Sequence, residues 1–227
     1  LKLILLIINN LLYKCYFILG KKSEKITEIL IINFPLFFKC SLTSLNKKTA
    51  QKYYQSTITG NTMQFNRDKY IDILMYILAK CYNKPNLGKT VLCSILYFID
   101  SNYYELYGKL LTKETYIKSK RGIKPAHFKE ITEELIANNQ LFLRKEPYYN
   151  RTIHRYYLTI IPSLKFSKQE LEILDFSINH LCDNNANSIL KYAIKDPPLL
   201  IADFGENIDC RYVFCRNNEY SAKKINK

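Results

Sequence analysis

The chain has 227 residues, of which 48% are hydrophobic, and this combination excludes a chain too polar to fold around a core. Its formal net charge of +14 points to three classes of acidic partner: nucleic acid, an anionic membrane surface or an acidic protein. Trp is absent, whereas Lys, Asn, Ile, Tyr and Phe dominate, as biased base composition alone would produce. We favour base composition as the reason for most of the lysines.

The seven cysteines include no Cys-x-x-Cys pair and show no regular spacing. An odd number of cysteines, in a chain long enough to build a core, argues against a disulfide framework. We therefore expect reduced, mostly buried thiols and a cytoplasmic protein.

The first 62 residues differ from the rest. Nine lysines and two acidic residues give them a charge of +7, and the remaining +7 belongs to residues 63–227.

The apolar segment Leu1–Gly20 contains two lysines, each costing about 2.5 to 3.5 kcal/mol at the centre of a membrane span. It can be read as a poor membrane anchor, a buried helix or in-frame upstream DNA, and we favour the last, with Met63 as the start. We expect residues 1–62 to form a poorly structured or helical extension, and we expect no membrane association.

Residues 63–227 predict a mainly α (α+β) fold, a compact helical domain with a small β-hairpin or minor sheet. Apolar residues between Ile71 and Tyr82 recur at helical spacing, and Pro85 ends that helix. A second helix is predicted over Lys89–Tyr103, with a turn at Gly108. The short segment 115–119 is β-prone.

Pro125 is suited to the first position of a third helix, whose apolar face holds Phe128, Ile131 and Leu135. Two strands, Leu141–Lys145 and Arg155–Ile160, predict a hairpin with a long tip at 146–154.

Ser167 and Glu170 have the spacing of a capping box, which predicts a helix start. Another helix is expected over Asn184–Tyr192, ended by Asp196-Pro197-Pro198. We expect a strand at 210–214 and a frayed tail over 217–227.

Three patterns suggest chemistry at first sight. Gly88-Lys89-Thr90 resembles the end of a phosphate-binding loop, but Asn83 stands where that loop needs its first glycine. His180 with three cysteines lacks the close, repeated spacing of a zinc site. The acidic residues on the third helix read as a solvated face. We therefore expect no catalytic residues, no metal and no cofactor, and no enzymatic activity.

The third helix followed by a hairpin has the order of a winged helix. Its basic side chains, interleaved with tyrosines, could neutralise phosphates and stack on bases. These residues are Lys120, Arg144, Lys145, Arg151 and Arg155. Glu130, Glu133 and Glu134 on the would-be recognition helix would repel a DNA backbone. A basic surface hairpin, or a basic face for an acidic protein, therefore ranks ahead of a DNA-binding regulator, which we keep as the alternative.

A series of short motifs resembles a known family. They are Leu96-Tyr97-Phe98-x-Asp100, Tyr107-Gly108-x-Leu110-Leu111-Thr112, Thr115-Tyr116, Gly122-Ile123-Lys124-Pro125, Phe166-Ser167-x-x-Glu170, Lys195-Asp196-x-Pro198 and Ile208-Asp209-x-x-x-Val213-Phe214-x-Arg216. In this order, between about Tyr70 and Arg216, they are similar to the SocA-like antitoxins, or Panacea domain, which are prokaryotic and often phage-associated.

The resemblance implies a helix-rich protein that neutralises a cognate toxin by binding it, with the toxin encoded next to it. In the SocA type the antitoxin also delivers its toxin to a bacterial protease. Antitoxins also often bind DNA to regulate the expression of their own genes. Interfaces depend on a few aromatic or Arg anchors. We expect such anchors among Tyr97, Tyr103, Tyr104, Tyr107 and Arg121.

The chain departs from the family pattern at three places. Ala193-Ile194 stands where one subgroup has Ser-His, Leu199 where it has Trp, and Ile123 where the family has Pro. These changes remove a polar pair and an aromatic side chain, which predicts altered partner contact if the family uses them for binding.

Overall fold

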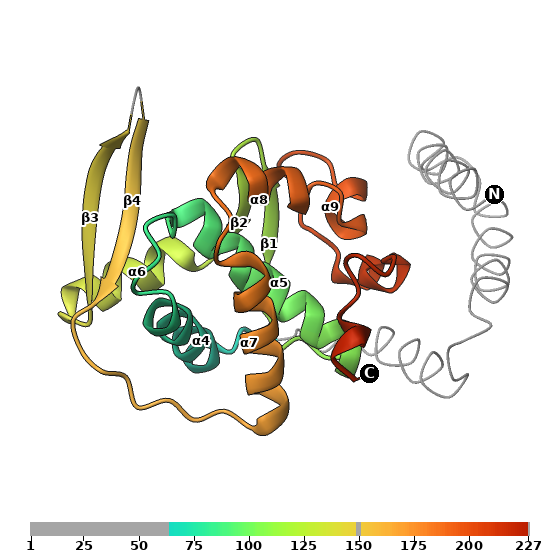
Figure 1. The fold of residues 1–227 in the computed structure, drawn as a ribbon, viewed down its shortest axis with the longest axis horizontal. Coiled ribbons are helices and arrows are strands. Elements are labelled where there is room, and N and C mark those ends of the chain that lie inside the picture. The colour runs from blue at the N-terminus through green and yellow to red at the C-terminus, as the bar shows by residue number, and fades with distance from the viewer. Residues whose placement is uncertain (1–63, 149–150, 227) are drawn as a thin grey trace, which may run out of the picture. The chain divides into compact units, whose positions relative to one another are not determined.

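The computed structural model describes residues 64–148 and 151–226, so the expectations for residues 1–62 lie outside the described residues. The mainly α fold class is confirmed, because the described part consists of helices with two small two-stranded antiparallel sheets (Figure 1). None of the described helices combines the length and apolar character that crossing a membrane requires.

Helix α5 (Lys89–Tyr107) is the centre of the fold. Fourteen of its 19 residues are buried, as expected for a helix enclosed on all sides. It contacts α4 (Arg67–Lys80), α7 (Lys168–Leu181), α8 (Ala186–Ala193) and β2 (Gly122–Pro125). The predicted turn is confirmed, since Gly108 ends α5 in the left-handed conformation with φ +67°.

The strands β1 (Tyr116–Ser119) and β2 pair in antiparallel fashion, with Tyr116 opposite Pro125. The prediction that Pro125 opens a helix is wrong, because Pro125 ends β2 and α6 begins only at Phe128. The cause is the next residue: Ala126 donates its backbone N–H to Thr115 O at 2.9 Å, which keeps the chain extended past the proline.

A longer hairpin follows α6 (Phe128–Ala137). It consists of β3 (Leu141–Tyr148) and β4 (Arg151–Leu158), which pair from Leu141↔Leu158 to Tyr148↔Arg151. The predicted long tip is therefore wrong. Cross-strand attraction favours the extra pairing, since Arg155 Nε donates to Glu146 Oε2 at 2.8 Å.

The predicted capping box at the start of α7 is confirmed. Ser167 Oγ accepts from Glu170 N, and Ser167 N donates to Glu170 Oε2 at 2.8 Å. Helix α8 begins after Asn185, whose side chain caps it, and α9 (Pro197–Ile201) begins directly after Asp196. The two prolines therefore form the first turn of a further helix rather than only ending α8.

The C-terminal predictions are wrong. The expected strand is a 3-10 helix, η1 (Cys210–Cys215), because the Asp209 side chain accepts from Arg211 N at 2.9 Å and caps a tight turn. The expected frayed tail instead contains the buried Ala222 and a second 3-10 helix, η2 (Ala222–Asn226). This tail joins the same hydrophobic core as α4 and α5.

Candidate partner-binding surface

Three of the family-like motifs, those with Phe98, Asp196 and Arg216, meet at one buried guanidinium group, that of Arg216. All five of its N–H donors have partners within 3.2 Å on two segments that are far apart in the sequence. They are Asp196, at the start of α9, and the α5 residues Ser101, Asn102 and Glu105. Burial alone would lower the pKa of Arg216, but its hydrogen bonds and ion pair with Asp196 outweigh burial and raise that pKa. The guanidinium is therefore a permanent structural cation.

Two carboxylates face this single cation, and other donors satisfy them. Tyr97 donates its hydroxyl to Asp196 Oδ2 at 2.9 Å. Glu105 accepts from Ser221 Oγ at 2.6 Å and from Ala222 N at 2.9 Å. The network thus binds the C-terminal tail to α5, which is why the tail is ordered.

A third buried carboxylate, Asp100, joins α5 to the segment before β1. It accepts from Thr112 N at 2.9 Å and from Tyr116 Oη at 2.7 Å, and the Thr112 hydroxyl also donates to it. Burial raises the pKa of Asp100 to about 6, although these hydrogen bonds act in the opposite direction. Because its partners are all structural, we assign Asp100 a role in folding.

The fourth buried carboxylate, Glu114, holds His127 at the start of α6. His127 Nδ1 lies 2.9 Å from Glu114 Oε1, and its ring stacks on Phe65 with centroids 4.0 Å apart. His180, Cys182, Cys210 and Cys215, the residues that weakly suggest a zinc set in the sequence, are not brought together. Within residues 64–148 and 151–226, no group of three or more His, Cys, Asp or Glu side chains is placed to hold a metal ion.

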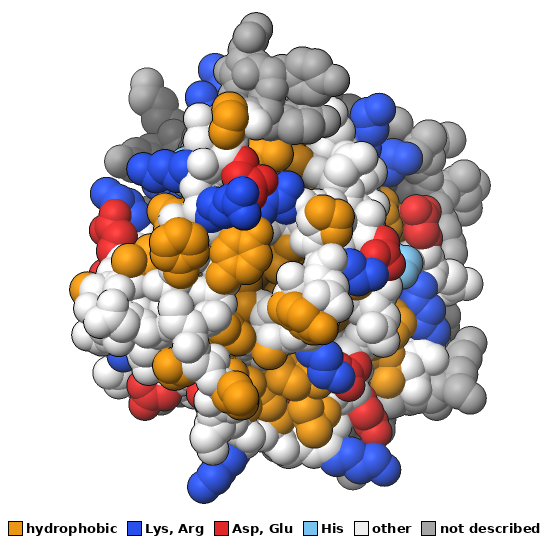
Figure 2. All heavy atoms as spheres, turned by 60° about the vertical axis from the view of Figure 1, so that its left-hand side comes forward, with side chains coloured by type: hydrophobic (Ala, Val, Ile, Leu, Met, Phe, Trp, Pro, Cys, Tyr) orange, Lys and Arg blue, Asp and Glu red, His pale blue; other side chains and the backbone are white. Residues whose placement is uncertain are grey.

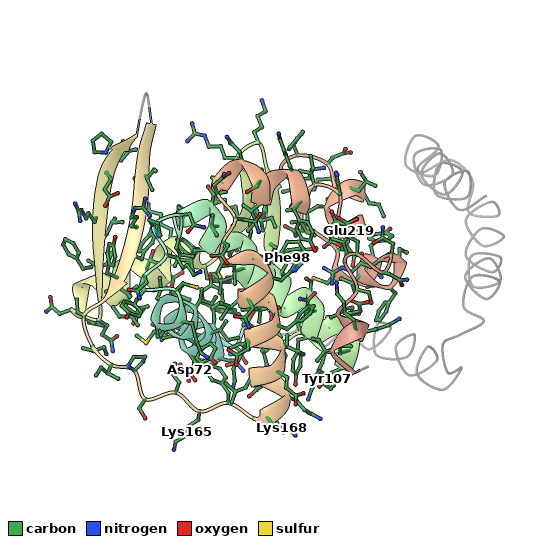
Figure 3. The ribbon with its side chains drawn as sticks, viewed as in Figure 1. Asp72, Phe98, Tyr107, Lys165, Lys168 and Glu219 are labelled. Carbon is green, nitrogen blue, oxygen red and sulfur yellow. The ribbon has the colours of Figure 1, made fainter. Side chains whose placement is uncertain are left out.

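A small cavity lies between α5, α7, α8 and the tail. Phe98 and Glu219 border it (Figure 3), and its volume is about 10 Å³. This is roughly the space of one water molecule, which is too small for a substrate.

The predicted partner-binding residues are divided between core and surface. Tyr97 is fully buried and Tyr103 is 6% exposed, so neither side chain is presented to a partner in this structure. Tyr104 and Tyr107 are half-buried near the end of α5, and Arg121 is exposed in the turn between β1 and β2. Toxin contact through these last three residues stays a prediction.

The predicted nucleic-acid residues lie on two hairpins. Lys120 is exposed in the β1–β2 turn, and Lys145 is exposed on β3. Arg144 and Arg155 share one carboxylate, Glu146, at 3.1 and 2.8 Å. Arg151 opens β4, and its side chain lies outside the described residues. The hairpin is therefore basic, but part of its charge is neutralised internally.

The departures from the family pattern fall mostly in the core. Ala193, Leu199 and Ile123 are at most 6% exposed, so these changes alter packing. Ile194 differs, because it is about half exposed at the end of α8. Of the four positions, only Ile194 could change a contact surface directly.

Sequence reasoning missed a surface groove between α4 and β4. Leu78 from α4 contributes to it, together with Cys81, Tyr82, Lys84 and Leu87 from the loop that follows α4 and residues 155–158 of β4. We call this the α4–β4 groove, and its volume is about 300 Å³. The sequence predicted the helix and the strand that form the two walls, but no sequence signal indicated that they lie side by side.

Comparison with known proteins agrees with the motif reading. Residues 92–198 match the family model described as antitoxin SocA-like, Panacea domain. This match confirms the resemblance over that segment, which runs from α5 to the start of α9. No curated protein and no solved structure matches the chain.

Proposed function

Because residues 92–198 carry a SocA-like Panacea domain, we propose that this protein is an antitoxin that neutralises a cognate toxin by binding it directly. The family match is the observation that carries the proposal. The toxin is expected to be encoded beside it. Reduced cysteines fit action in the cytoplasm, and the five cysteines of the described part are all free thiols.

The arrangement of polar side chains supports action by contact rather than by catalysis. Arg216, Asp196 and Asp100 have fully buried side chains, and their partners tie α5 to α9, to β1 and to the tail. Such a network uses its charged groups to hold segments together, and it leaves a rigid exterior for recognition.

The direct test is rescue from toxicity. The neighbouring open reading frame is expressed in a host cell with and without the full chain, and growth is measured. We expect arrest without the chain and growth with it. A harmless neighbour, or arrest that co-expression leaves unchanged, would show that the simple antitoxin proposal is wrong.

A role as adaptor to a bacterial protease would extend this proposal. It is tested by blocking translation and following the toxin's half-life with and without the full chain. We expect a shorter half-life only in hosts that retain their proteases. An unchanged half-life beside full rescue would leave neutralisation by binding alone.

A winged-helix-type regulator is the second candidate function. The observation that favours it is the order of α6, β3 and β4, with Lys145 and Arg144 on the hairpin. For binding to the operon's own promoter DNA, the logarithm of the association constant should then fall steeply and linearly with the logarithm of the salt concentration. Exposed Glu130 and Glu133 on α6 and the internal pairing by Glu146 count against it.

A further inference from the structure

We propose that the α4–β4 groove is the toxin-docking site, and that it receives an apolar side chain of the toxin that is flanked by carboxylates. This inference rests on the proposed antitoxin function and names the surface that performs it. Four features of the described residues carry it: shape, exposed apolar area, an unpaired strand edge and charge.

The groove has the size and lining of a pocket for an anchor residue. Its floor consists of well-buried apolar side chains: Leu78, Cys81, Leu87 and Tyr156. A volume of about 300 Å³ lies at the lower end of ordinary binding pockets and exceeds what one large side chain fills. An aromatic or branched aliphatic side chain can therefore enter without rearrangement of the core.

Exposed apolar side chains gather around the groove. Tyr82 is 72% exposed at one wall, and Tyr157 is 36% exposed at the other. Phe142 is the cross-strand partner of Tyr157 and is 56% exposed on the same outer face of the hairpin. Figure 2 shows hydrophobic side chains at the centre of this side of the molecule, with Lys and Arg around them. A grouped, exposed apolar patch with a polar rim is typical of a protein interface.

The edge of β4 that does not face β3 is unpaired, and Gly88 packs near Ile153 and His154 along part of it. Strand β4 pairs with β3 on one side, and the described backbone makes no hydrogen bond from residues 151–158 to any other element. An unpaired strand edge offers N–H and C=O groups to an extended segment of a partner. The unpaired edge near residues 155–158 thus supplies polar contacts beside the apolar anchor pocket.

Charge selects the partner. The hairpin from Leu141 to Leu158 contains four basic residues and one acidic residue, a net charge of +3. Arg144 and Arg155 share the single carboxylate Glu146, and Lys84 at the opposite wall pairs with the exposed Asp183. Basic walls favour an acidic flank on the incoming segment. They disfavour residues 1–62 of this chain, which carry +7 themselves.

The test measures binding of the full chain to the purified product of the neighbouring open reading frame. Tyr82→Ala removes an exposed wall of the groove, and Phe204→Ala is the matched control, because Phe204 is 64% exposed on the segment after α9. We expect Tyr82→Ala to weaken the toxin Kd by about 30-fold, as for an aromatic anchor, and Phe204→Ala to leave it nearly unchanged. Thermal unfolding of both variants checks that the fold is intact.

A charge variant tests the second half of the inference. Lys84→Glu should weaken toxin binding, and more so at low salt, whereas Lys124→Glu, at the exposed position of β2, should not. If both groove variants bind and neutralise the toxin like the wild type, the groove is not the docking site and the antitoxin function stands. If the wild type binds no toxin, the proposed function fails and this inference with it. If the wild type binds promoter DNA, and Lys84→Glu abolishes that binding while Lys124→Glu does not, the groove is a nucleic-acid site and the inference is overturned.

Discussion

Arg216 and Asp196 form a bidentate ion pair whose side chains are both fully buried. Arg216 Nε donates to Asp196 Oδ1 and Nη2 donates to Asp196 Oδ2, each at 2.7 Å. The pair joins the residue after η1 to the residue before α9, and Tyr97 of α5 donates to the same carboxylate. Three segments distant in sequence therefore depend on one contact.

Loss of this cation should be severely destabilising. Arg216→Ala would leave Asp196 and Glu105 buried without a counter-ion, and we expect unfolding to become easier by about 3 to 5 kcal/mol. Arg216→Lys should also cost stability, because an ammonium group cannot reproduce the planar five-donor geometry. Urea unfolding of the full chain measures both. The exposed pair Arg211–Asp209 provides the control, and Arg211→Ala should cost less than about 1 kcal/mol. Equal losses for Arg216→Ala and Arg211→Ala would contradict a structural role for the buried pair.

A side chain at Gly122 should be destabilising. It has φ +113°, and a Cβ there would lie 2.5 Å from Leu190 Cδ2 of α8. Gly205 is the matched control, because its φ is +92° and no atom lies within 4 Å of its added Cβ. Gly122→Ala should therefore lower the melting temperature more than Gly205→Ala, which reports backbone strain alone. Equal shifts would mean that contact with Leu190 has no energetic role.

Asp100 should make the protein more stable at mildly acidic pH than at neutral pH. Burial raises the pKa of Asp100 from 3.8 to about 6. The unfolded chain therefore releases this proton at lower pH than the folded chain does. The contribution of Asp100 is fully present below about pH 4, and about 3 kcal/mol of it is lost as pH rises to about 6.

Asp100→Asn isolates this effect, because an amide stays neutral at every pH. We expect the difference in unfolding free energy between wild type and variant to change in favour of the variant as pH rises from about 4 to about 6. Above that range the difference should be constant. A difference that does not change with pH, or that favours the wild type as pH rises, would refute the assignment.

The capping box of α7 makes a smaller, local prediction. Ser167→Ala removes the acceptor for Glu170 N and should cost about 1 kcal/mol in urea unfolding. Ser163 is exposed in the segment before the helix, and Ser163→Ala should have almost no effect. If the two variants unfold alike, the box contributes nothing measurable.

Features set by neighbouring residues were predictable from the sequence. The periodic apolar faces predicted α4, α5 and α6, the capping box predicted α7, and two strand-like segments predicted the β3–β4 hairpin. The family motifs were readable too, although their roles were not. Asp100, Asp196 and Arg216 all stand in quoted motifs, but a motif does not say that its charges lie in the core.

Errors arose where a distant contact overrode a local preference. Pro125 is suited to a helix start, but the ladder between Thr115 and Ala126 keeps it extended. The polar tail was expected to fray, but Glu105 of α5 binds Ser221 and Ala222. Toxin contact by Tyr97 stays a prediction, and in this structure its hydroxyl donates to the buried carboxylate of Asp196.

The sequence by itself determined the helical fold class, most helix positions and the SocA-like motifs, because hydrophobic spacing, helix caps and motif order are properties of short stretches of chain. Only the tertiary structure decided which charges are buried and which apolar residues remain exposed. The guanidinium of Arg216 has its partners 20 and more than 100 residues away, and Tyr82 and Tyr157 face one groove from two separate elements. Burial and pairing depend on such distant neighbours, and no local pattern encodes them.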